Sequence, residues 1–119
     1  MNITLEWPDP KLSPNARGHW RVKAEASKKA RKKAHDTVLK LGYGGNEWEN
    51  TIGCIEFRIA FYPPDNRHRD DDNLIAMMKP YRDGIADALG INDRRFKTIA
   101  EIMPAEKGKK RVEISLCAL

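Results

Sequence analysis

Small apolar side chains recur at every third or fourth position between Val22 and Leu41, and this repeat constrains the fold more than any other feature. The spacing places them on one face of a single helix, and Gly42 stands where that helix would end. The repeat consists of Val22, Ala26, Ala30, Ala34, Val38 and Leu41. A long helix with one apolar stripe must bury that stripe against another layer of secondary structure.

Four other segments have the residue pattern of β-strands. Apolar and polar side chains alternate in residues 3–7 and 55–61, and residues 96–103 and 111–116 are also strand-like. Gly44, Gly45 and Asn46 predict a loop before the second strand, and Pro63 and Pro64 predict its end. The turn over residues 106–109 predicts that the last two strands form an antiparallel hairpin.

A second helical repeat runs from Leu74 to Leu89 and ends at Gly90. Pro80 lies inside it, and because proline removes a backbone donor we expect two helical segments. The order βαβαββ then predicts an α/β two-layer sandwich with two helices on a mixed sheet. The length of 119 residues predicts a single domain, residues 1–119. The face of the sheet that the helices leave uncovered could be covered by a second copy of the chain in a dimer.

The balance of charge points to a polyanionic partner. The formal net charge is +5 and the sequence pI is near 9.3, which favours nucleic acid or an anionic membrane. No apolar run approaches the roughly 20 residues of a membrane span, and residues 1–7 carry Glu6 and no basic region, so we expect neither membrane insertion nor secretion. Cys54 and Cys117 lie in apolar strand patterns, so we expect buried, reduced thiols in a cytoplasmic protein.

Three consecutive aspartates, Asp70, Asp71 and Asp72, precede the second helix. Ionised neighbours of this kind repel one another, and an extended chain places Asp70 and Asp72 on one side, where a hard cation would neutralise them. Asp93 lies in the loop before the third strand and could approach them. Oxygen ligands suit Mg²⁺ or Mn²⁺. The alternative is that the three aspartates cap a helix and Asp93 forms an Asx-turn.

At these residues the chain resembles the RusA family of Holliday-junction-resolving endonucleases. The resemblance rests on Arg69-Asp70-Asp71-Asp72-Asn73-Leu74, on Lys79 with Asp83 four residues later, and on Ile91-Asn92-Asp93. It implies a homodimer of bacterial or phage origin that requires Mg²⁺, binds four-way DNA junctions and makes paired phosphodiester cuts in recombination and repair.

The resemblance also implies site residues. Asp70, Asp72 and Asp93 match the metal-binding, catalytic carboxylates of the family, and Lys79 is assigned as the catalytic lysine. The family lysine usually lies four residues after the second aspartate, where this chain has Ala76, so Lys79 matches through a short insertion. The alternative for Lys79 is a solvated i,i+4 ion pair with Asp83.

We expect DNA contacts from basic residues of the first helix and of the acidic loops. The basic residues of the first helix could equally form a solvated helix face. Asn15, His19 and Trp20 precede or begin the first helix and could reach an unpaired base, although the sequence predicts a core position for Trp20. The predicted DNA-binding residues are Asn15, Lys28, Lys29, Arg31, Lys32, Lys33, Arg67, Arg69, Arg94 and Arg95.

Two other functions compete with the nuclease. A non-catalytic, basic DNA-binding module would have no use for carboxylates close to phosphate, where they repel DNA. A metal-dependent phosphatase or nucleotide hydrolase would lack an evident glycine-rich phosphate cradle in this chain and would not need so basic a surface. The sequence therefore favours a nuclease.

Overall fold

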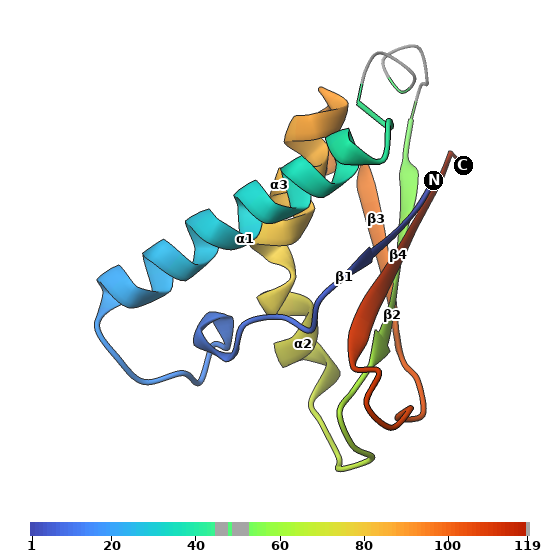
Figure 1. Cartoon of the computed structure of the whole chain (residues 1–119). Helices are drawn as coiled ribbons and strands as arrows, with labels where there is room; N and C mark the ends of the chain where they lie inside the picture. The colour runs from blue at the N-terminus through green and yellow to red at the C-terminus, as the bar shows by residue number, and fades with distance from the viewer. Residues whose placement is uncertain (45–47, 49–52, 119) are drawn as a thin grey trace.

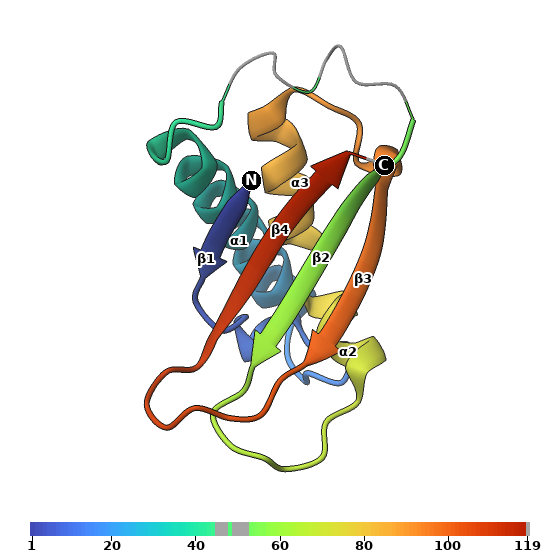
Figure 2. The ribbon, with the colours of Figure 1, turned by 90° about the vertical axis from the view of Figure 1, so that its right-hand side faces the viewer.

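One mixed β-sheet organises the chain, and the α-helices lie against one of its faces (Figures 1 and 2). The computed structural model describes residues 1–44, 48 and 53–118; the predicted loop residues Gly45 and Asn46 lie outside them. The two-layer α/β sandwich is confirmed. Its elements are β1 (Asn2–Leu5), the 3-10 turn η1 (Pro10–Leu12), α1 (Trp20–Lys40), β2 (Ile55–Tyr62), α2 (Asp71–Met77), α3 (Lys79–Leu89), η2 (Asp93–Arg95), β3 (Phe96–Ile102) and β4 (Arg111–Ala118).

The strand order β1-β4-β2-β3 corrects one prediction from the sequence. β3 and β4 do not form a hairpin, because β2 lies between them and pairs parallel with β3 and antiparallel with β4. The predicted turn itself is present, since the Lys109 N–H donates to the Glu106 carbonyl at 3.0 Å. The segment between Ile102 and Arg111 carries the chain past the end of β2, so β4 can also pair with β1.

The apolar repeat of α1 forms much of the helix side of the core. Ala26, Ala30, Ala34 and Val38 are buried as predicted, against the sheet face that contains Phe57 and Ile114. The two ends of the repeat are not buried: Val22 is 45% exposed and Leu41 is 53% exposed. Figure 1 shows that the N-terminal half of α1 projects beyond the sheet, which leaves its first turns without a covering layer.

A glycine allows α1 and α3 to approach closely. A Cβ at Gly84 would overlap the backbone carbonyl of Arg31, so no larger residue fits there without moving one helix. Beside this contact, the Arg31 guanidinium binds both carboxylate oxygens of Asp87, at 2.6 and 2.9 Å. This bond lowers the pKa of the Asp87 carboxyl. The pair fixes α3 and the loop that follows it relative to α1.

The second helical repeat is divided, as predicted. α2 ends at Met77 and α3 begins at Lys79, with Pro80 in the first turn of α3. Proline fits the first turn because its missing N–H has no intrahelical partner there. Met78 joins the two helices and is buried, so the break lies inside the core and orients the two helices separately.

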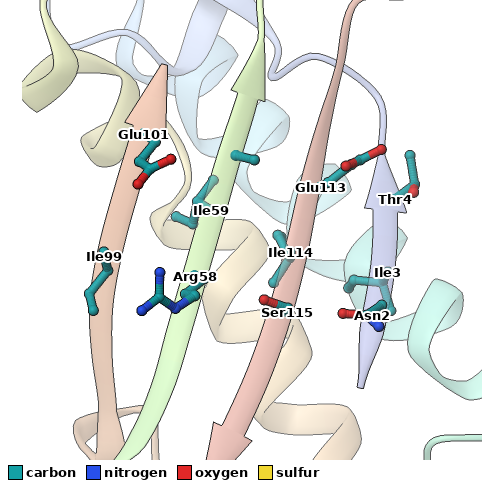
Figure 3. Close-up of a pocket in the computed structure, with 11 residues that line it drawn as sticks. Asn2, Ile3, Thr4, Arg58, Ile59, Ile99, Glu101, Glu113, Ile114 and Ser115 are labelled. Carbon is teal, nitrogen blue, oxygen red and sulfur yellow. The ribbon is translucent and has the colours of Figure 1, made fainter. Parts of the chain in front are cut away.

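The other face of the sheet carries a shallow groove of about 420 Å³ (Figure 3). Its lining includes the charged residues Arg58, Glu101 and Glu113, together with Ile99 and Ser115. Cys117 belongs to this face and is exposed, and Cys54 precedes β2 and is also exposed. The prediction that both thiols are buried is therefore wrong, because Cys117 lies on the side of β4 that faces away from the helices and Cys54 lies before β2 begins. No helix in the described part of the chain is both long and apolar enough to span a membrane.

Candidate metal site and nucleic-acid surface

The three consecutive aspartates form an exposed cluster at the start of α2. Asp70 is the N-cap of the helix, and its Oδ1 accepts the Asp72 N–H at 2.9 Å. Asp71 and Asp72 occupy the first turn, where the helix dipole favours negative charge. One carboxylate oxygen from each residue lies within 4.8 Å of the others. We call Asp70, Asp71 and Asp72 the aspartate cluster.

The loop before the cluster is held in shape by Arg69. Its guanidinium donates to the Asp65 carbonyl and to Asp65 Oδ1, each at 2.8 Å, and it lies 5.9 Å from the Trp7 ring centroid. The Arg69 side chain is only 16% exposed. The Arg67 N–H and then the Arg69 side chain lower the pKa of the Asp65 carboxyl. Arg69, predicted to bind DNA, therefore has a structural role in positioning Asp70.

The donor set of the cluster suits a hard divalent cation. Mg²⁺ takes oxygen ligands at 2.0–2.1 Å, so two opposite ligands lie about 4 Å apart. The three carboxylate oxygens of the cluster lie within 4.8 Å of one another, and exposed side chains can rotate to bring them to metal-ligand distances. Capping occupies one oxygen of Asp70 and leaves the other for a metal ion. Ion pairs with Asp70, Asp71 or Asp72 are absent within the described residues, so no side chain of that part of the chain neutralises their charge.

Asp93 is not part of the aspartate cluster. Its carboxylate lies 3.5 Å from Arg82 and 3.8 Å from Lys79, whose ammonium also lies 3.5 Å from Asp83. Asp93 precedes β3, whereas α2 lies beside the opposite end of that strand (Figure 2). The structure thus brings together Asp70 with Asp72, and Lys79 with Asp93, as two separate groups. We call Lys79, Arg82, Asp83 and Asp93 the paired cluster.

Arg82 ties the paired cluster to the sheet. Its guanidinium donates to the Thr98 hydroxyl at 3.3 Å and to the Asp93 carbonyl at 3.2 Å, and it lies 5.9 Å from the Phe96 ring centroid. The ion pair between Lys79 and Asp83, which was the alternative to a catalytic lysine, is present. Lys79 also lies close to Asp93, so its contacts extend beyond its own helix.

Most of the predicted DNA contacts on α1 are engaged in ion pairs. Arg31 binds Asp87, as described above, and three exposed lysines each lie within 3.4 Å of a carboxylate. These pairs are Lys29–Glu25, Lys32–Asp36 and Lys33–Glu6. Exposed pairs of this kind contribute little to stability and exchange readily for other partners. Their presence shows that this face is less strongly cationic than its composition suggests.

The loop arginines divide into two groups. Arg95 donates to the carbonyls of Gly53 and Trp48, at 3.0 and 3.1 Å, and so connects η2 to two residues that precede β2. Arg67 is exposed and pairs with Asp65 at 3.2 Å. Two of the predicted cationic contacts, Lys28 and Arg94, have exposed side chains with no ion pair and no hydrogen bond among the described residues. Asn15, the remaining predicted contact, is also exposed.

The prediction that Trp20 lies in the core is wrong. Its side chain is 68% exposed, because α1 begins where it projects away from the sheet. The basic residues around it, Lys11, Arg17, Arg21 and Lys23, were not among the predicted contacts. The available signal was a tryptophan at the very start of a helical repeat, flanked on both sides by positive charge.

The fold and the site define a two-layer α/β sandwich with exposed carboxylates at a helix start. No family model matches the chain. A protein of Xylella fastidiosa (strain Temecula1) that is described only as uncharacterized is 50% identical over 96 residues. The match covers 81% of this chain, and the chain spans 62% of the length of that relative.

Proposed function

We propose that the protein is a metal-dependent endodeoxyribonuclease of the RusA type, which resolves Holliday junctions by paired cleavage of phosphodiester bonds. The observation that carries the proposal is the aspartate cluster, which gathers three exposed carboxylates without a cation from the described part of the fold. Structural carboxylates are normally paired or hydrogen-bonded, as Asp93 is here. An enzyme of this kind acts on DNA in the cytoplasm.

Asp70 and Asp72 would hold Mg²⁺, with Mn²⁺ as a substitute. The bound ion would supply a Lewis acid that stabilises charge on phosphate oxygens and lowers the pKa of a water molecule. Capping of α2 by Asp70 fixes the direction of its carboxylate relative to Asp72. Arg69 keeps the preceding loop in the shape that presents both side chains.

Lys79 is the residue that we propose to contact the phosphate. Its side chain is 65% exposed at the start of α3, and Asp83 and Asp93 lie on either side of its ammonium group. These carboxylates restrain a flexible lysine, which would present a single positive charge to the phosphate. Resemblance assigns Asp93 as a third metal ligand, and this assignment stays a prediction because Asp93 faces Lys79 and Arg82.

Paired cleavage requires two sites related by symmetry, so we propose a homodimer. Its support in this chain is the sheet face opposite the helices, where a groove contains both charged and apolar side chains. Sedimentation velocity at increasing protein concentration tests this step. A species with twice the mass of the chain, at 13.6 kDa per chain, is expected.

A cleavage assay tests the proposed function. The substrates are a four-way junction, a linear duplex of the same sequence and a small phosphoester, each with Mg²⁺ or with EDTA. We expect symmetrical cuts in the junction with Mg²⁺ alone. Hydrolysis of the small phosphoester without cleavage of DNA would instead indicate a phosphatase.

One observation favours a second candidate, a non-catalytic DNA-binding module. Helix capping already accounts for Asp70, and Asp93 lies outside the cluster in ion pairs, so these two carboxylates have a structural explanation without a metal ion. This candidate predicts junction binding that is independent of Mg²⁺ and no cleavage under any metal condition. The D70N variant separates the two, because asparagine caps a helix as well as aspartate but carries no charge for a metal ion.

A further inference from the structure

The most exposed large apolar side chain in the described residues is Trp20, in the first turn of α1. Two neighbouring side chains nevertheless contact its indole. The His19 ring lies 5.5 Å away, centroid to centroid, at an angle of 32°, and the Arg21 guanidinium lies 5.4 Å from the indole centroid. His19 is itself fixed as the N-cap of α1, since its Nδ1 accepts the Arg21 N–H at 3.2 Å. The fold therefore presents to solvent an aromatic ring that His19 and Arg21 contact.

Positive charge surrounds this ring. A small hollow of about 70 Å³ beside Trp20 is lined by Lys11, Arg17 and Lys23, and none of its lining residues is acidic. In the part of the chain that is described, these three cations have no side-chain ion pair or hydrogen bond. The lysines farther along α1 differ, because Lys29, Lys32 and Lys33 are paired with carboxylates. The N-terminal end of α1 thus combines an exposed π face with cations that are available to phosphates.

We propose that this end of α1 binds an unpaired nucleobase, with Trp20 stacking on the base and the flanking cations contacting the adjacent phosphates. The proposal rests on the proposed function, because unpaired or splayed bases are what branched DNA offers and a linear duplex does not. Stacking on an aromatic ring tolerates any base, since every base has a π face. His19 and Arg21 contact the ring in the unbound chain, which lowers the entropic cost of ordering it on binding.

The chemistry of the surface favours nucleic acid over a lipid or protein partner. A helix that inserts into a membrane interface needs a broad apolar face, whereas the apolar neighbour exposed beside Trp20 is Val22. The cores of protein interfaces are depleted in charge, yet four cations surround this ring. A polyanion with flat aromatic groups, such as nucleic acid, fits both the exposed indole ring and the cations around it.

Binding of DNA without cleavage tests the inference. The probes are a single-stranded oligonucleotide and a four-way junction with 2-aminopurine at its centre, titrated at fixed salt in EDTA with W20A, W20F and the matched control V22A. Loss of one stacked base corresponds to about 1–3 kcal/mol, so we expect W20A to weaken single-strand binding about 5- to 150-fold. W20F should retain most of the affinity, and V22A, which removes exposed apolar surface beside the ring, should stay within about twofold.

Unchanged affinity of W20A for both probes would overturn the inference. So would conversion of a dimer to a monomer by W20A with unchanged DNA affinity per chain, because Trp20 would then contact a second copy. The same experiments distinguish failure of the proposed nuclease function from failure of the base-binding site. If no DNA is cleaved but W20A still loses single-strand binding, the base-binding site stands and the nuclease does not. If junctions are cleaved and W20A binds and cleaves them like the wild type, only the base-binding site is lost.

Discussion

The two groups of carboxylates near α2 and α3 differ in how their charge is neutralised. The aspartate cluster is exposed and has no cationic partner among the described residues, whereas Asp93 in the paired cluster lies within 3.8 Å of both Lys79 and Arg82. Both groups are close to the start of a helix or turn, so local structure does not explain the difference. The fold therefore pairs Asp93 with cations of its own, whereas no described cation pairs with the aspartate cluster, and for this cluster we propose a metal ion from solution.

The largest effect that follows from this comparison is on cleavage by D72N. Removing one charged ligand should reduce the rate of junction cleavage by more than about 100-fold, because even the loss of a group that supports a ligand costs 10- to 100-fold. The matched control is D71N, which removes the same charge from the neighbouring position. Rates are measured under single-turnover conditions, with junction binding measured separately in EDTA.

D71N should retain cleavage within about tenfold, because the resemblance assigns the metal to the first and third aspartates. Junction binding by D72N should be unimpaired, since removal of a negative charge does not weaken contact with phosphate. Equal loss of cleavage in D71N and D72N would mean that total charge, and not a defined ligand pair, controls the reaction.

A smaller effect is expected from D93N, which sharpens the distinction between the two groups. The variant loses partly exposed ion pairs with Lys79 and Arg82, so the free energy of unfolding should fall by about 1 kcal/mol or less. The structure predicts that Mg²⁺ affinity stays within about threefold of the wild type, while cleavage falls because Lys79 is no longer restrained. Isothermal calorimetry and urea denaturation measure the two quantities.

If Mg²⁺ affinity in D93N fell as far as it does in D72N, Asp93 would be a ligand. The chain would then have to rearrange on metal binding, so that the loop before β3 approaches the start of α2. This result would restore the full set of three ligands that the resemblance implies and would break the contrast between the two groups.

The smallest effect on stability is expected for the Arg31–Asp87 ion pair, a second place in the fold where a cation neutralises a carboxylate. Arg31 lowers the pKa of Asp87, so the pair stabilises the folded state above the unfolded pKa of about 3.9 and loses that contribution as the pH falls through the lower folded value. Because Asp87 is 42% exposed, D87N should cost a few tenths of a kcal/mol at pH 7. The difference between D87N and the wild type should vanish near pH 2, and a difference that persisted there would mean that packing, not charge, is lost.

The sequence predicts those parts of the fold that depend on local periodicity. The buried alanines of α1, the alternating strand β2 and the division of the second helix at Pro80 all follow from spacing along the chain. The strand order does not, because a turn between residues 106 and 109 is compatible with either a hairpin or a passage across β2. Pairing in a sheet is decided by non-local contacts that one strand's pattern does not encode.

The candidate site shows the same limit. Asp70 and Asp72 are neighbours in the chain, so their proximity is predictable, whereas the place of Asp93 depends on how α3, which lies between β2 and β3 in the chain, packs in the fold. The sequence predicts a core position for Trp20, because tryptophan is highly buried on average. Its exposure depends on how far α1 extends past the sheet, and this length is a property of the assembled fold.

Binding of Mn²⁺, measured by electron paramagnetic resonance, tests the central claim directly. The wild-type chain is compared with D70N/D72N and with E25Q/E101Q, which removes two exposed negative charges outside the aspartate cluster. We predict that the wild type and E25Q/E101Q bind the ion with similar affinity and that D70N/D72N does not bind it. Equal binding by all three proteins would contradict the account, because the aspartate cluster would then be no more than the start of a helix.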